Sequence, residues 1–81
     1  MENRIAILGI IVEQEDSVEH VNELLHLYRE YIIGRMGMPY RERGISVISI
    51  VMDATSDIVS ALSGKLGMLE GVSAKAVYSK K

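Results

Sequence analysis

The fold is decided by the stretch Arg4-Ile-Ala-Ile-Leu-Gly-Ile-Ile-Val12, an aliphatic run rich in β-branched residues. Charged residues between Glu13 and Asp16 end it. A short apolar run bounded by charge is typical of a strand that is buried on both faces. A second such run extends from Ile45 to Met52. It places Ile48, Ile50 and Met52 on one face, and Ile45, Val47 and Val51 on the other.

A helix is predicted after the first run. Asp16 is the expected N-cap, and Glu19 three residues later would complete a capping box. Gly34 is the expected end of this helix. Apolar residues recur at spacings of three and four, which places them on one helical face: Val18, Val21, Leu25, Tyr28 and Ile32.

The segment from Ile32 to Tyr40 contains two glycines and Pro39, which favours an edge or irregular strand. Arg41 to Gly44 is charged and ends in glycine, which indicates a hairpin loop before the second run.

A second helix is predicted from Thr55, its expected N-cap, with Asp57 in the first turn where it favours the helix dipole. Gly67 is its expected C′ residue, and Gly71 opens a last strand. The buried face of the helix is expected to consist of Ile58, Ala61, Leu62 and Leu66. In the last strand Val72, Ala74, Ala76 and Tyr78 alternate with Ser73, Lys75 and Val77, as in a strand with one wet face near an edge.

The order strand, helix, strand, strand, helix, strand predicts an α+β fold: a ferredoxin-like βαββαβ sandwich of the ACT-like kind. Its four-stranded antiparallel sheet would carry both helices on one face, with the two apolar runs as central strands. The 81 residues are expected to form a single domain, residues 1–81. A domain this small has a marginal core, and the absence of cysteine removes disulfides as a means of stabilising it.

Composition and charge restrict the expected partners. The formal net charge is −2, without the basic excess of a nucleic-acid binder, and no Trp or Phe is present for base stacking. No stretch is long and apolar enough to span a bilayer, and the N-terminal run lacks a signal-peptide cleavage site. We therefore expect a cytoplasmic protein that binds neither membranes nor nucleic acid directly.

Both helices are expected to cover one face of the sheet, so the other face would expose side chains such as Val47 and Val51. An exposed apolar patch of this kind usually marks an interface. Leu24, Leu27 and Tyr31 widen the apolar arc of the first helix, which indicates either further interface or a broad amphipathic face. A homo-oligomer, a dimer or a tetramer, is the expected state.

No constellation of catalytic residues is apparent, so we expect no enzyme, no metal and no cofactor. His20 and His26 are six residues apart on the predicted helix and diverge by about 120°. They could share a metal only across a subunit interface. The carboxylates from Glu13 to Glu19 are explained by a helix start, with cation binding as the alternative.

The densest polar feature surrounds the predicted hairpin and consists of Arg35, Tyr40, Arg41 and Arg43. Three guanidinium groups and a phenol could bind an anion or an acidic partner. The alternative is a solvated hairpin whose arginines protect a sheet edge from aggregation.

Three segments resemble the small regulators associated with iron-only hydrogenase systems: Ile33-Gly-Arg-Met-Gly-Met-Pro-Tyr-Arg-Glu-Arg-Gly44 with Ile45-Ser-Val-Ile-Ser49, Leu62-Ser-Gly-Lys-Leu-Gly67, and Gly71-Val-Ser73. The resemblance extends from about Arg4 to Ser79. It implies an ACT-like fold, similar to the C-terminal domain of the nickel-responsive repressor NikR. It also implies a regulatory role in the company of hydrogenase maturation proteins.

Two departures limit what the resemblance implies. Amino-acid-binding ACT domains usually have a glycine in the first strand–helix loop, and Glu13 to Ser17 has none. The nickel-responsive domain uses Cys and several His, which this chain lacks. We therefore expect an oligomeric regulatory module that binds a small-molecule effector or a protein partner. The alternative is a non-sensing accessory protein that docks on a hydrogenase maturation enzyme.

Overall fold

The computed structural model describes residues 2–80 of the chain. The four strands are β1 (Arg4–Val12), β2 (Ile32–Tyr40), β3 (Ile45–Ala54) and β4 (Val72–Tyr78). The two α-helices are α1 (Val18–Leu27) and α2 (Ser56–Gly67). Three short 3-10 turns connect them: η1 (Glu15–Ser17), η2 (Arg29–Tyr31) and η3 (Arg41–Arg43).

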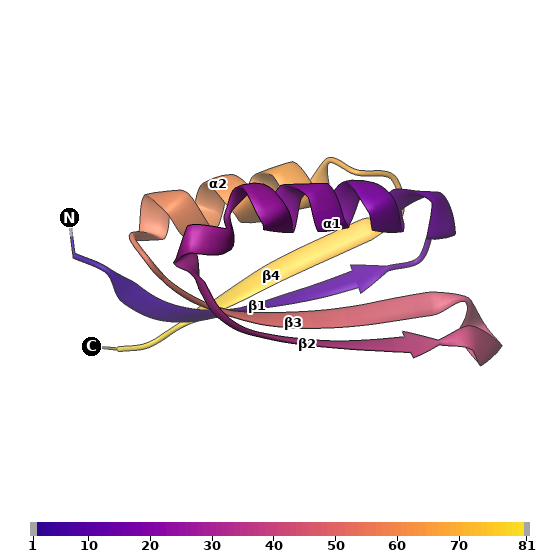
Figure 1. The fold of residues 1–81 in the computed structure, drawn as a ribbon, viewed down its shortest axis with the longest axis horizontal. Helices are drawn as coiled ribbons and strands as arrows, with labels where there is room; N and C mark the ends of the chain where they lie inside the picture. Colours follow the sequence, from indigo (N-terminus) through magenta and orange to yellow (C-terminus); the bar gives the residue numbers. More distant parts are fainter. Residues whose placement is uncertain (1, 81) are drawn as a thin grey trace.

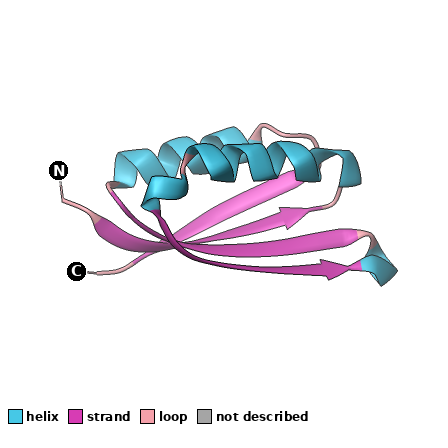
Figure 2. Ribbon diagram, in the orientation of Figure 1, coloured by secondary structure: helices cyan, strands magenta, loops and turns pink. Residues whose placement is uncertain are grey.

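The strands form one antiparallel sheet in the order β2-β3-β1-β4. Both α-helices lie side by side on the same face of this sheet (Figures 1 and 2). The predicted ferredoxin-like βαββαβ fold is therefore confirmed, with β1 and β3 as the central strands and β2 and β4 at the edges.

Alternation along the central strands separates the core from the opposite face. In β1 the even-numbered side chains from Ala6 to Val12 are buried under the helices, and in β3 the buried set includes Ile48, Ile50 and Met52. The helices supply Val21, Leu25, Val59, Leu62 and Leu66 to the same cluster. The predicted division of β3 into two faces is confirmed.

The predicted start and end of the first helix are wrong. The turn η1 precedes α1, so the N-cap position belongs to Ser17 and not to Asp16, and no side chain caps the helix. The hydroxyl of buried Ser17 instead donates to the carbonyl of Glu70 at 2.7 Å. The helix ends at Leu27 because Ile32 is already paired with Met52 of β3, and Gly34 lies within β2.

Two details of the second helix also differ from the prediction. Leu62 and Leu66 are buried and Ile58 packs against the core, as predicted. Ala61 is exposed, however, and Val59 is buried in its place. Gly67 is the last helical residue, and Met68 takes the C-cap position in a right-handed conformation. The left-handed backbone is found at Gly71 instead, where the turn enters β4.

Thr55 is the N-cap of α2, as predicted, and its hydroxyl accepts a hydrogen bond from the backbone N–H of Ile58 at 3.3 Å. We expect Thr55→Ala to lower the free energy of unfolding by about 1 kcal/mol, because this N–H loses its partner. Urea denaturation measures the loss, and Ser60→Ala at an exposed position of the same helix serves as the control. An equal loss in both variants would contradict a capping role for Thr55.

Candidate functional site

The face of the sheet away from the helices is apolar, and we call it the open face. Within β1 and β3, register pairs Ile7 with Val51 and Ile11 with Val47 on this side. Strand β2 adds Met36, Met38 and Tyr40, which pair with Ser49, Val47 and Ile45 of β3. The large exposed hydrophobic residues of the open face are Ile5, Ile7, Ile11, Met36, Met38, Tyr40, Val47 and Val77.

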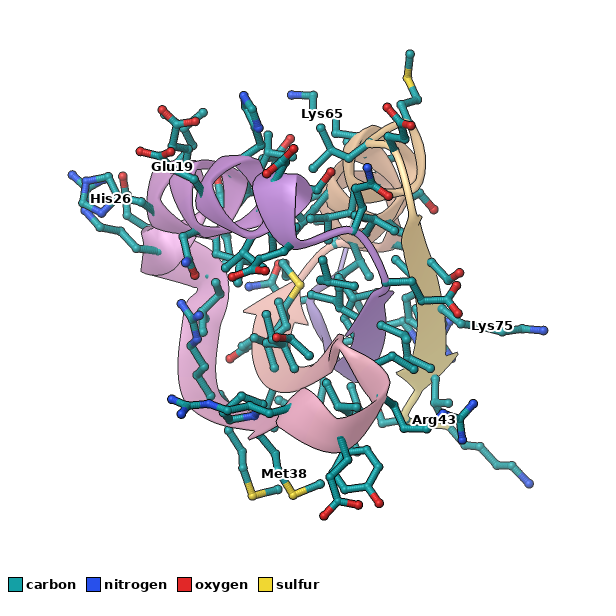
Figure 3. All side chains as sticks on the ribbon, turned by 90° about the vertical axis from the view of Figure 1, so that its right-hand side faces the viewer. Glu19, His26, Met38, Arg43, Lys65 and Lys75 are labelled. Atoms are coloured by element: carbon teal, nitrogen blue, oxygen red, sulfur yellow. The ribbon has the colours of Figure 1, made fainter. Side chains whose placement is uncertain are left out.

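A β-bulge between Ile32 and Gly34 determines which side chains of β2 reach the open face. Ile32 pairs with the buried Met52, whereas Gly34 pairs with Val51 on the other side. The bulge thus reverses the alternation, and Met36 and Met38 turn away from the helices. Figure 3 shows Met38 at the end of the molecule opposite the two helices.

The predicted interface residues Leu24 and Leu27 of α1 and Tyr31 of η2 do not belong to the open face, since α1 covers the other side of the sheet. Leu24 and Tyr31 are half-buried and pack against the hydrophobic core. Leu27 is different, because 69% of its surface is exposed. Val47 and Leu27 therefore mark two separate surfaces, of which the open face has the larger set of apolar side chains.

A groove of about 790 Å³ lies between the start of α1 and the tip of the β2–β3 hairpin. One wall carries Glu15, Glu19 and Asn22, and the other carries Tyr40 and Arg41. Its remaining lining residues are Val12, Val18, Pro39, Gly44, Ile45 and Ser46. The volume falls in the range of small-molecule pockets, and the lining combines charges of both signs with an apolar surface.

The predicted arginine block is divided by the structure. Tyr40 and Arg41 line the groove, whereas Arg35 donates to the side-chain oxygen of Asn22 at 2.6 Å. Arg43 is not among the residues that line the groove, and Figure 3 shows it on the side of the hairpin tip nearer β4. The block does not form one cationic cluster.

The juxtaposition of Glu15 and Glu19 with Arg41 was missed by sequence reasoning. These residues are far apart in the chain, and only the fold brings the start of α1 above the hairpin tip. The sequence signal is the acidic segment at the start of the first helix, for which a helix start is the favoured explanation and cation binding the alternative. The two carboxylates make the groove mixed in charge, not an anion site.

Within residues 2–80, no group of three or more His, Asp or Glu side chains is placed to hold a metal ion. No helix in that part of the chain is long and apolar enough to cross a membrane.

The sheet order, the two helices on one face and the apolar face opposite them define a ferredoxin-like α+β domain. Residues 4–76 match the family described as "TM1266-like: Iron-only hydrogenase system regulator, putative". The chain belongs to this family, and the predicted resemblance is confirmed.

A solved structure supports the assignment. The uncharacterized protein TM1266 from Thermotoga maritima is similar to this chain with a TM-score of 0.93 and 44% sequence identity. The similarity covers 98% of this chain and 100% of that one. No curated protein matches the chain.

Proposed function

We propose that this chain is a regulatory module of an iron-only hydrogenase system that acts by binding, without catalysis, as a homo-oligomer. The observation that carries the proposal is the open face. Most of its exposed side chains are apolar and are suited to contact with another apolar surface. Family membership supplies the link to the hydrogenase system.

The hydrophobic effect favours the burial of the open face against another surface. Each large apolar side chain removed from water contributes roughly 1.5–3 kcal/mol. A domain of this size has a total stability of only about 5–10 kcal/mol. Ile7, Ile11 and Val47 are 48%, 44% and 37% exposed in the single chain, so covering each of them would contribute roughly 0.5–1.5 kcal/mol. The three together would add a substantial fraction of the stability of the single chain.

The charges on the open face favour a second copy of the chain as its binding partner. The strand residues on this face carry one acidic and one basic side chain, Asp53 and Lys75. Two identical faces can therefore meet without net repulsion. Pro39 lacks an N–H on the edge strand β2, which disfavours pairing of copies through that edge.

Sedimentation velocity of the unmodified protein, from nanomolar to micromolar concentration, tests the proposal. We expect a reversible equilibrium between a monomer and a dimer or tetramer. A stable monomer at micromolar concentration would contradict self-association. Co-purification from native extract with mass spectrometry would then test the accessory role, in which the face docks on a hydrogenase maturation protein.

A further inference from the structure

Two methionines stand side by side on the open face. Met36 and Met38 are two positions apart on β2, so they project from the same side of the strand. They are 72% and 60% exposed in the single chain. Met1 lies outside the described residues, and the remaining two methionines differ sharply: Met52 is buried in the core, and Met68 is exposed after α2, away from the open face.

We propose that Met36 and Met38 are a reversible oxidation site that controls docking of the open face. The oxidant is a hydroperoxide. The inference rests on the proposed function, because oxidation changes docking only if this face is a contact surface.

The chemistry balances with hydrogen peroxide as the oxidant. A lone pair of the thioether sulfur attacks one peroxide oxygen, the O–O bond breaks, and the sulfur becomes a sulfoxide. The oxygen is transferred as a hydroxyl group, and the departing hydroxide takes the proton of that group and leaves as water. The sulfur loses two electrons and the peroxide gains them. Methionine sulfoxide reductase, with a dithiol as the reductant, reverses the change.

Because the two sulfurs lie on the open face, their oxidation would change how strongly this face docks on another surface. A thioether packs readily into an apolar contact because its chain is unbranched and flexible. A sulfoxide is polar, and at Met38, which pairs with Val47, it would be pressed against the apolar side chains of a docked copy. Burying it without a hydrogen-bond partner is unfavourable. The oxidised chain is therefore held in its separated form.

Association and oxidation oppose each other by mass action. A docked copy covers Met36 and Met38, so peroxide reaches them in the separated chain. Their rate of oxidation should fall as protein concentration rises, whereas the rate at Met68 should stay constant. Met52 is 0% exposed and should react only if the chain unfolds.

The experiment treats the full chain with hydrogen peroxide and follows each methionine by peptide mass spectrometry, with sedimentation velocity as the readout of association. We expect oxidation at positions 36 and 38 to weaken association about tenfold or more. Reductase treatment should restore it. Circular dichroism and an unoxidised Met52 establish that the chain stays folded.

The double variant Met36→Leu with Met38→Leu keeps an apolar face that peroxide cannot modify, so its association should resist the treatment. Met68→Leu is the matched control and should remain as sensitive as the unmodified chain. Unchanged association of a chain oxidised at positions 36 and 38 would overturn the inference while leaving the proposed function intact. A monomer before any oxidation would instead overturn the proposed function.

Discussion

Substituting Lys for Val47 should convert the proposed oligomer to monomers at micromolar concentration. Val47 lies on central strand β3, between Ile11 of β1 and Met38 of β2. A copy docked on the open face would bury an ammonium group at this position without a partner, which costs several kcal/mol. Such a loss weakens association by about a thousandfold or more. Sedimentation velocity measures the shift.

The single chain should tolerate the same substitution. Val47 is 37% exposed, so a lysine at this position can reach water in the monomer. Circular dichroism should therefore report an unchanged fold. The melting temperature of the unmodified protein should rise with protein concentration, because association stabilises the folded state, whereas that of Val47→Lys should not.

Leu27→Lys is the matched control, since it makes the same change of charge at an exposed leucine of α1. If the open face is the contact surface, this variant should associate like the unmodified protein. The opposite pattern, monomers from Leu27→Lys and oligomers from Val47→Lys, would transfer the interface to α1. Loss of association in both variants would indicate that the copies meet through both surfaces.

Much of the open face could be predicted from local alternation. Ile45 to Met52 divides correctly into a core side and an open side, because side chains alternate strictly along an uninterrupted strand. The contribution of β2 could not be predicted in this way. A single extra residue at the bulge after Ile32 exchanges the two sides of the strand, and a pattern weakened by Gly34 and Gly37 does not reveal it.

The predicted boundaries of α1 were wrong for a different reason. The observed boundaries depend on contacts between residues that are distant in the sequence. The hydroxyl of Ser17 finds its acceptor at Glu70, 53 positions away, and Ile32 is held by pairing with Met52. Local capping rules could not anticipate either partner. The groove has the same origin, because Glu15 and Arg41 come to line one groove only after the hairpin has folded beneath the start of α1. Thr55 was predicted correctly since its partner Ile58 is three residues away.

Gly71 is the position where a single added methyl group should cost most. Its φ is +70°, a left-handed conformation in which a residue with a Cβ is strained by about 1–2 kcal/mol. An added Cβ would also lie 2.6 Å from the Cβ of Gln14 and 3.0 Å from its backbone nitrogen. The backbone of the β1–α1 connection would have to move.

That movement would disturb the hydrogen bonds between the β1–α1 connection and the turn that precedes β4. The N–H of Glu13 donates to the carbonyl of Gly71 at 2.7 Å, and Ser17 binds the preceding residue, Glu70. Losing one of these hydrogen bonds costs about 0.5–1.5 kcal/mol. With the backbone strain, Gly71→Ala should lower the free energy of unfolding by roughly 1.5–3.5 kcal/mol, a large share of the stability of so small a domain.

The variant Gly44→Ala separates the two causes of destabilisation, the backbone strain and the close approach of the added Cβ to Gln14. Gly44 has a similar φ of +64°, yet nothing lies within 4 Å of the position its Cβ would take. This variant should lose only the strain, about 1–2 kcal/mol. Gly71→Asn provides the complementary comparison, because asparagine tolerates the left-handed region but keeps the Cβ that meets Gln14. Urea denaturation should place Gly71→Ala lowest, below both Gly71→Asn and Gly44→Ala, because it alone combines the strain with the close approach to Gln14. Equal losses at positions 44 and 71 would mean that the connection yields freely and that the close approach to Gln14 contributes nothing to stability.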